Sequence, residues 1–130
     1  MAKFSKTSLA RLEGVDYRLQ DLAHRVVMLH HDCTVLYGRR TEAEQAKLVQ
    51  EGLSRTMNSR HLTGHAIDLA PYPIDWNNKK RFYYFGGIVV AVAKELNIPL
   101  RWGGDWDSDD DLDDQKFMDL VHFEIPRGQE

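Results

Sequence analysis

Residues 59 to 70 read Ser59-Arg60-His61-Leu62-Thr63-Gly64-His65-Ala66-Ile67-Asp68-Leu69-Ala70. The two histidines and Asp68 would share one face of a helix, but Gly64 interrupts such a helix and prolines follow at positions 71 and 73. We therefore expect a turn at Gly64 and then a short buried strand, Ala66–Leu69. The stretch thus places two imidazoles and a carboxylate around the start of a strand.

The chain upstream of this stretch predicts a helix, a strand and a second helix. Apolar residues recur with helical spacing from Leu9 to Leu29, which indicates a helix of about 20 residues. Cys33–Tyr37 has the β-branched and aromatic content of a buried strand. Thr41 and Glu44 form a capping box that opens a helix ending near Gly52. Arg40 therefore lies where a strand gives way to a helix.

The chain downstream predicts one more helix and two more strands. Asp75 offers an N-cap, and the helix after it has an apolar stripe formed by Phe82, Phe85, Val89, Val92 and Leu96. Its Gly86-Gly87 pair costs helix stability, so we expect close packing against a neighbour there. Residues 98–102 and 120–125 read as strands. The pattern predicts an α+β fold, with a small antiparallel sheet packed with about three helices in a single domain, residues 1–130.

Composition and charge narrow the classes of function. The 130 residues carry a net charge of -3, yet seven aspartates lie between positions 105 and 114, so the rest of the chain is mildly basic. This balance suits a polyanion or a cell-wall polymer, and it lacks the basic stripe of a nucleic-acid binder. The single cysteine, Cys33, excludes an intramolecular disulfide and is expected to be a buried small hydrophobe.

The N-terminus and the hydropathy predict where the protein is made. Met1-Ala2-Lys3-Phe4-Ser5-Lys6 is positively charged, but no apolar segment of a secretory signal follows it. No apolar stretch is long enough to span or insert into a membrane. We therefore expect folding in the cytoplasm.

A third candidate ligand lies far downstream, in Asp119-Leu120-Val121-His122-Phe123-Glu124. Neutral imidazole and carboxylate are the groups with which proteins bind Zn²⁺ when thiolates are absent, and a catalytic site keeps a fourth position open. Strand alternation puts His122 and Glu124 on one face. A histidine between apolar neighbours is more often structural than a ligand, but Asp119 lies within reach as a general base. If the two stretches meet, the site is that of a metal hydrolase.

Four separated motifs carry a resemblance to a known family. They are Gly38-Arg39-Arg40-Thr41, Ser59-x-His61-x-x-Gly64-x-Ala66-x-Asp68, Arg101-Trp102-Gly103-Gly104-Asp105-Trp106 and Asp119-x-x-His122. In this order, over residues 38 to 124, they resemble the zinc peptidase family that includes the VanX- and VanY-type D-Ala-D-Ala peptidases. The resemblance is closest to its phage endolysin branch, the L-alanyl-D-glutamate endopeptidases that cut peptidoglycan stem peptides.

The resemblance implies a role for each matching residue. His61, Asp68 and His122 would bind Zn²⁺, and Asp119 would be the catalytic base where the dipeptidase branch typically has glutamate. Arg40 would face the substrate carbonyl, and Arg39, which departs from the family's small or apolar residue, would face solvent. These roles agree with physical chemistry: zinc lowers the pKa of bound water to near 7, a carboxylate shuttles the proton, and a fixed cation stabilises the oxyanion.

Two polar residues beside the motifs have alternative interpretations. His61 and His65 have the spacing of a zincin pair, but Leu62 stands where that motif needs glutamate. We therefore assign His65 a peripheral role. Glu124 shares a strand face with His122, so it could orient substrate or be a solvated surface residue.

The aspartate-rich segment is either a solvated acidic loop or a Ca²⁺ site. Carboxylates alternate at Asp105, Asp107, Asp109 and Asp111 as in an EF-hand loop, although the glycine and the terminal glutamate of that motif are absent. Crowded carboxylates repel one another, and a hard cation relieves the repulsion. Calcium-dependent ordering, known for some phage members of the branch, would then act as a switch after release from the cytosol.

The function expected from the resemblance is zinc-dependent cleavage of the L-Ala–D-Glu bond in peptidoglycan stem peptides by a phage endolysin. Trp102, Trp106 and Tyr72 are candidates for the substrate-lining wall. The enzyme would be a monomer that stays in the host cytoplasm until a holin lets it reach the cell wall. The alternatives are a D,D-carboxypeptidase or dipeptidase of the same family, and a catalytically inactive, metal-dependent recognition module.

Overall fold

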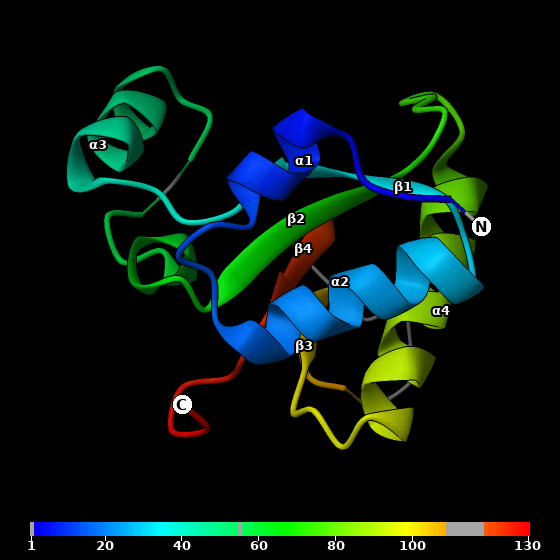
Figure 1. Cartoon of the computed structure of the whole chain (residues 1–130). Coiled ribbons are helices and arrows are strands. Elements are labelled where there is room, and N and C mark those ends of the chain that lie inside the picture. The colour runs from blue at the N-terminus through cyan, green and yellow to red at the C-terminus, as the bar shows by residue number, and fades with distance from the viewer. Residues whose placement is uncertain (1, 55, 109–118) are drawn as a thin grey trace.

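The computed structural model describes residues 2–54, 56–108 and 119–130. Its elements in chain order are α1 (Lys6–Arg11), α2 (Tyr17–Leu29), β1 (Cys33–Tyr37), α3 (Glu42–Gln50), the 3₁₀ helix η1 (Arg60–Thr63), β2 (Ala66–Pro71), α4 (Lys79–Glu95), β3 (Arg101–Gly103) and β4 (Asp119–Glu124). The strands form one antiparallel sheet in the order β1-β2-β4-β3 (Figure 1). The α+β class predicted from the sequence is confirmed.

The N-terminal region forms two helices, whereas the sequence predicted a single one from Leu9 to Leu29. Gly14 adopts a left-handed conformation with φ 77°, which ends the first helical segment. The Asp16 side chain then accepts a hydrogen bond from the Arg18 amide at 2.9 Å and caps α2. Leu12 and Val15 are buried at the corner between them. The prediction of one continuous helix was wrong because a left-handed glycine and a new N-cap restart the chain.

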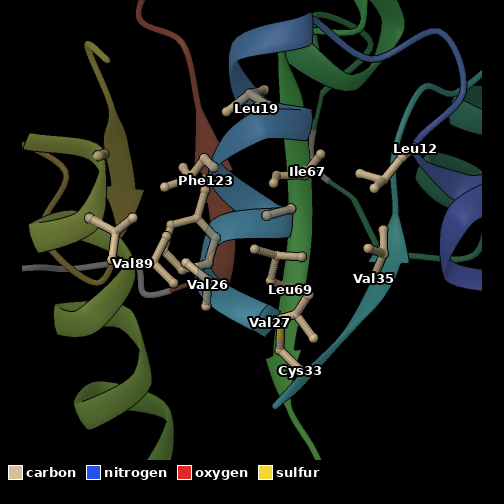
Figure 2. Close-up of a cluster of buried hydrophobic side chains, with 14 of the residues drawn as sticks. Leu12, Leu19, Val26, Val27, Cys33, Val35, Ile67, Leu69, Val89 and Phe123 are labelled. Carbon is tan, nitrogen blue, oxygen red and sulfur yellow. The ribbon is translucent and has the colours of Figure 1, made fainter. Parts of the chain in front are cut away.

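Helices α2 and α4 cover one face of the sheet (Figure 1). Figure 2 shows the core between them, in which Val26 of α2 and Val89 of α4 lie over β2 and β4. Ile67, Leu69 and Phe123 are fully buried on that face. Successive strand residues point to opposite faces, so the residues that alternate with these three along β2 and β4 point to the face away from α2 and α4. The core therefore fixes which side of the sheet carries the polar residues of β2 and β4.

The close packing expected at the Gly86-Gly87 pair is confirmed for Gly86. A Cβ atom at Gly86 would lie 2.1 Å from Cζ2 of Trp102, and one at Gly104 would lie 2.4 Å from the same atom. Trp102 stacks on Phe123 with an interplanar angle of 7°, and its indole N–H donates to the Leu120 carbonyl at 2.9 Å. The indole thus joins α4, β3 and β4 in one tightly packed unit.

Several element boundaries differ from the predicted ones, and β2 continues to Pro71 rather than ending at Leu69. Asn78, rather than Asp75, caps α4, since residues 75 to 78 form a turn in which Asp75 accepts hydrogen bonds from the amides of Asn77 and Asn78. Strand β3 begins only at Arg101, after Asn97 at φ 56° and Pro99. Strand β4 begins at Asp119 and ends at Glu124. Among the described residues, no helix has the length and apolar character needed to cross a membrane.

Candidate metal centre and active site

His61 lies in η1, a short helix held at both ends by its own sequence. The Ser59 side chain accepts a hydrogen bond from the His61 amide at 3.2 Å, and Gly64 ends the helix at φ 79°. A Cβ at Gly64 would lie 2.4 Å from the Gly14 carbonyl oxygen, so glycine is needed there for space as well as for backbone conformation. The His61 ring is consequently buried and fixed at the edge of the sheet.

Asp68 and His122 are direct cross-strand partners on β2 and β4. The Asp68 Oδ1 atom lies 3.1 Å from Nε2 of His61 and 3.3 Å from Nδ1 of His122. One ligand atom from each of the three residues lies within 4.8 Å of the other two, and all three residues are buried. The fold therefore brings the three candidate zinc ligands of the sequence analysis together at one point.

Each of the two imidazoles uses its other nitrogen for a hydrogen bond that orients the ring. His61 Nδ1 donates to the Gly38 carbonyl at 2.7 Å, and His122 Nε2 donates to Glu124 Oε1 at 2.7 Å. Metal-binding histidines commonly have such an outer partner, which selects the tautomer and increases the basicity of the ligand nitrogen. The donor set, two oriented imidazoles and a carboxylate, fits a catalytic Zn²⁺ site with an open position.

The protonation of the metal-free site follows from the same contacts. Burial alone would raise the pKa of Asp68, but hydrogen bonds from His122 and His61 outweigh it and hold that pKa below its usual range. Burial would lower the pKa of His122, yet hydrogen bonds to Asp68 and Glu124 raise it to about 9. A proton on His122 therefore balances the buried carboxylates when no metal is bound.

Arg40 is mounted beside this triad, at the junction between β1 and α3. Its backbone amide donates to the His61 carbonyl at 3.0 Å, and its Nη2 lies 3.7 Å from Asp68 Oδ2. Its guanidinium carbon lies 4.6 Å from the centre of the Tyr37 ring. The predicted capping box of α3 is present, with Thr41 and Glu44 each bonding the backbone of the other at 3.1 Å. Arg39, the preceding residue, is exposed.

Gln45 holds the Arg40 side chain in place. Its Oε1 accepts a hydrogen bond from Arg40 Nη1 at 3.0 Å, while its Nε2 donates to Ser54 Oγ at 2.9 Å and to the Thr56 carbonyl at 2.7 Å. Gln45 is fully buried, so its side-chain amide is shielded from water. Among the residues that the structure describes, the buried Nε of Arg40 has no hydrogen-bond partner. The guanidinium itself lines the cleft into which the triad opens.

Asp119 begins β4 and lines the same cleft as the triad. A Cβ at Gly103 would lie 2.0 Å from the Asp119 carbonyl oxygen, so glycine allows β3 and β4 to approach closely here. Burial raises the pKa of Asp119, and the negative charge of Asp68 adds to this effect. A raised pKa makes this carboxylate a stronger proton acceptor, and the same group can then return the proton.

The triad opens into a cleft of about 990 Å³ between the sheet and the loop that follows α3. Trp106 lines this cleft, and its ring centre lies 5.5 Å from that of His122. Trp102 is instead 5 % exposed and belongs to the core, and Tyr72, at 54 % exposure, is not part of the wall of this cleft. Of the three aromatic residues considered for substrate contact, the structure therefore brings only Trp106 to the triad.

The remaining sequence candidates lie away from the triad or outside the described residues. His65 Nδ1 is 2.6 Å from Thr63 Oγ1, and its Nε2 lies 3.9 Å from Asp16, so this imidazole has other partners than the triad. Asp105 is buried beside Trp102, with which it forms a β-bridge, and Asp107 is exposed. Asp109 and Asp111 lie outside the described residues, and the expected calcium site remains a prediction.

Sequence reasoning missed two groups that shape the site and left the role of a third undecided. The Gly38 carbonyl and Gln45 were not considered. For Glu124, the sequence allowed either a role in orienting the substrate or a solvated surface position. Glu124 is in fact buried against His122. Its position two residues after His122 on one strand was the available signal, whereas nothing in the sequence connects Gln45 with Ser54 and Thr56.

Comparison with known proteins identifies the family. The family model described as "Phage L-alanyl-D-glutamate peptidase" matches residues 1–125. The chain is 38 % identical to the L-alanyl-D-glutamate peptidase of Escherichia phage T5, over 97 % of this chain and 90 % of that protein. It is 36 % identical to the peptidase of the same name from Listeria phage A118, over 66 % of this chain and 27 % of that protein.

A solved structure is similar over nearly the whole fold. The crystal structure of the Serratia marcescens L-Ala D-Glu endopeptidase ChiX superposes with a TM-score of 0.70 at 30 % sequence identity, covering 95 % of this chain and 90 % of that one. The relatives found by sequence and by structure carry the same activity in their names. The chain belongs to the phage L-alanyl-D-glutamate peptidase family.

Proposed function

We propose that this protein is a zinc-dependent endopeptidase that hydrolyses the L-Ala–D-Glu bond of peptidoglycan stem peptides. The observation that carries the proposal is the convergence of His61, Asp68 and His122 in a cleft that Arg40 and Asp119 also line. The names of the two phage relatives and of the Serratia enzyme support the choice of bond.

Zn²⁺ bound by the triad would supply a polarised water whose pKa lies near 7. Asp119 accepts a proton from the water molecule as its oxygen attacks the L-Ala carbonyl carbon. It returns that proton to the D-Glu nitrogen as the C–N bond breaks, so the products are a carboxylate and a free amine. The raised pKa of the buried Asp119 supports this use of one carboxylate in both directions.

Arg40 stabilises the negative charge that develops on the carbonyl oxygen. Gln45 and Tyr37 already hold its side chain, so little reorganisation is needed when the charge appears. A preorganised donor of this kind contributes roughly 3 kcal/mol to transition-state stabilisation in other hydrolases. Arg40 lines the cleft in which that oxygen would lie.

Lysis of a bacterial host is the biological role that we propose for this activity. The match to a phage family supports it. Under this proposal, a monomer folded in the host cytoplasm passes a holin-permeabilised membrane and then cleaves the wall, and calcium bound by the aspartate-rich segment increases its activity after release. Purified enzyme assayed with and without calcium would test the last step, because equal rates would exclude calcium control.

Mass spectrometry of purified peptidoglycan digested by the protein tests the proposed bond. We expect new peptides that begin with D-Glu, together with muramoyl-L-alanine on the glycan strands. Release of terminal D-Ala or of D-Ala-D-Ala would instead indicate a D,D-carboxypeptidase or dipeptidase. Digests without new termini, from protein shown to bind zinc, would indicate a recognition module and contradict the proposed activity.

A further inference from the structure

A second groove adjoins the cleft of the metal centre. It has a volume of about 550 Å³ and shares Tyr37, Arg40 and Asp68 with the first cleft. Asp68 belongs to the triad and Arg40 lies 3.7 Å from it, so the two depressions meet beside the metal centre. A substrate cleaved at this point would extend into the first cleft on one side and into the second groove on the other.

The two depressions differ in charge. Among the residues that the structure describes, the first cleft is lined by four arginines and three carboxylates, namely Arg40, Arg60, Arg101 and Arg127 with Asp68, Asp119 and Glu124, and the Glu130 carboxylate pairs with Arg60 at 3.0 Å. A bound divalent metal would therefore give this cleft a net positive charge. The second groove is balanced, with three arginines and three carboxylates: Arg11, Arg39 and Arg40 with Glu13, Glu44 and Asp68. The first cleft therefore suits an anionic group, and the second suits a neutral, polar one.

The two sides of the L-Ala–D-Glu bond differ in the same way. The D-Glu side carries a free carboxylate next to the scissile nitrogen. The L-Ala side is uncharged, because its amine forms an amide with the lactyl group of N-acetylmuramic acid. Charge complementarity thus directs D-Glu to the first cleft and the sugar to the second groove.

Trp76 provides an aromatic surface at the second groove. It is 61 % exposed, and it stacks on the buried Phe82 with ring centres 5.3 Å apart and an interplanar angle of 15°. The loop around it is tied by a hydrogen bond from the Arg81 guanidinium to the Pro73 carbonyl. One indole face is therefore occupied, and the other is held ready for a ligand at little entropic cost.

We propose that the second groove is a saccharide subsite in which Trp76 packs against the C–H face of the N-acetylmuramic acid ring. The mixed charges of the groove pair with the sugar hydroxyl and acetamido groups. This inference rests on the proposed function and adds to it a preference for stem peptides still attached to glycan. Trp is suited to such a contact because its ring offers a large apolar face and its N–H a polar edge.

Two matched substrates test the subsite. One is an N-acetyl-L-alanyl-D-glutamyl peptide, and the other is the same peptide carried on N-acetylmuramic acid, so that only the sugar differs. We expect wild-type protein to favour the muramoyl substrate in kcat/KM. Trp76→Ala should lower kcat/KM for that substrate by roughly 3- to 10-fold, which is the size of one aromatic contact, and the change should lie mainly in KM. The kcat/KM for the acetyl substrate should stay unchanged. Trp76→Phe should retain most of the preference.

Tyr17→Ala is the control, because Tyr17 is 72 % exposed and lies outside both depressions. This variant should leave kcat/KM unchanged for both substrates. Equal wild-type rates on both substrates, or an equal loss on both in Trp76→Ala, would overturn the subsite. If wild-type protein cleaves neither substrate, the proposed function fails. N-acetylmuramoyl-L-alanine, titrated against the indole N–H resonance of Trp76, then decides the subsite alone: a shift supports it, and no shift at millimolar ligand contradicts it.

Discussion

Glu124 accepts a hydrogen bond of 2.7 Å from Nε2 of His122, and this bond leaves Nδ1 of the same ring directed at Asp68. The two residues lie on one face of β4, separated by a single residue. The strand therefore carries a ligand together with the group that orients it. The predictions below begin with this pair.

Removing the carboxylate of Glu124 should weaken metal binding without displacing any ligand. We expect Glu124→Ala to reduce zinc affinity by about 10- to 100-fold, the usual loss for an outer partner of a metal-binding histidine. Glu124→Gln keeps a hydrogen-bond acceptor for His122 and should lose less zinc affinity. Competition with a chromophoric chelator measures both. Glu95→Gln, on the exposed end of α4, is the control, and wild-type affinity in Glu124→Ala would exclude the orienting role.

Asp119→Ala should retain zinc and fold but lose peptidase activity. Asp119 is not among the three residues of the metal group, so its loss removes the proton carrier alone. Metal content, thermal unfolding and the rate on purified peptidoglycan should be measured on one preparation. An unchanged rate would remove Asp119 from the mechanism.

Zinc binding should release a proton at neutral pH. Although burial opposes it, hydrogen bonds to Asp68 and Glu124 raise the pKa of His122 to about 9 in the metal-free protein. Metal must displace this proton, so apparent affinity should rise roughly tenfold per pH unit above neutrality and level off past the pKa of His122. Calorimetry in buffers of different ionisation enthalpy measures the release. A pH-independent affinity between neutral pH and the pKa of His122 would contradict the prediction.

The stability of the metal-free protein should change in the opposite direction with pH. The folded-state pKa of His122 lies above its unfolded value, so its contribution to the free energy of unfolding is complete below about pH 6.5. That contribution decreases as pH rises towards about 9. Chemical unfolding of chelator-treated protein at several pH values measures the trend, and His122→Gln should flatten it.

Gln45 should affect catalysis through Arg40. Gln45→Ala removes a fully buried side chain together with its three hydrogen bonds, to Arg40 Nη1, Ser54 Oγ and the Thr56 carbonyl, which should cost about 1–3 kcal/mol of stability. We expect kcat to fall more than KM rises, because Arg40 acts on the transition state. Ser54→Ala removes the two loop bonds of Ser54 Oγ but keeps the bond between Gln45 and Arg40, so it should leave kcat nearly unchanged. Equal effects of the two variants on kcat would argue that Gln45 acts only on the loop.

Substitution of the two adjacent glycines of α4 by alanine should change the free energy of unfolding in opposite directions. A Cβ at Gly86 would meet the Trp102 ring at 2.1 Å, whereas a Cβ at Gly87 would have no neighbour within 4 Å. Gly86→Ala should destabilise the protein by about 1–3 kcal/mol through overpacking. Gly87→Ala should stabilise it by roughly 0.5–1 kcal/mol, because alanine favours the helix. Thermal unfolding compares the two, and matching signs would contradict the packing seen at Trp102.

Local sequence determined much of the secondary structure and the candidate ligands. Hydrophobic period, capping residues and strand alternation depend on neighbours a few positions apart, so they indicated β1, the capping box of α3, the strand after Gly64 and the shared face of His122 and Glu124. The same local information failed at Gly14 and Asp75. There, two competing turn and cap signals lay close together, and tertiary packing chose between them.

Tertiary structure decided which distant groups meet. The pairing of Asp68 with His122 depends on the register of β2 against β4, and that register is set by the core on the opposite face of the sheet. The same packing placed Trp102 in the core, brought Gln45 to Arg40, and joined the groove of Trp76 to the metal centre. Contacts between residues far apart in sequence depend on how whole elements pack, and no short-range pattern encodes them.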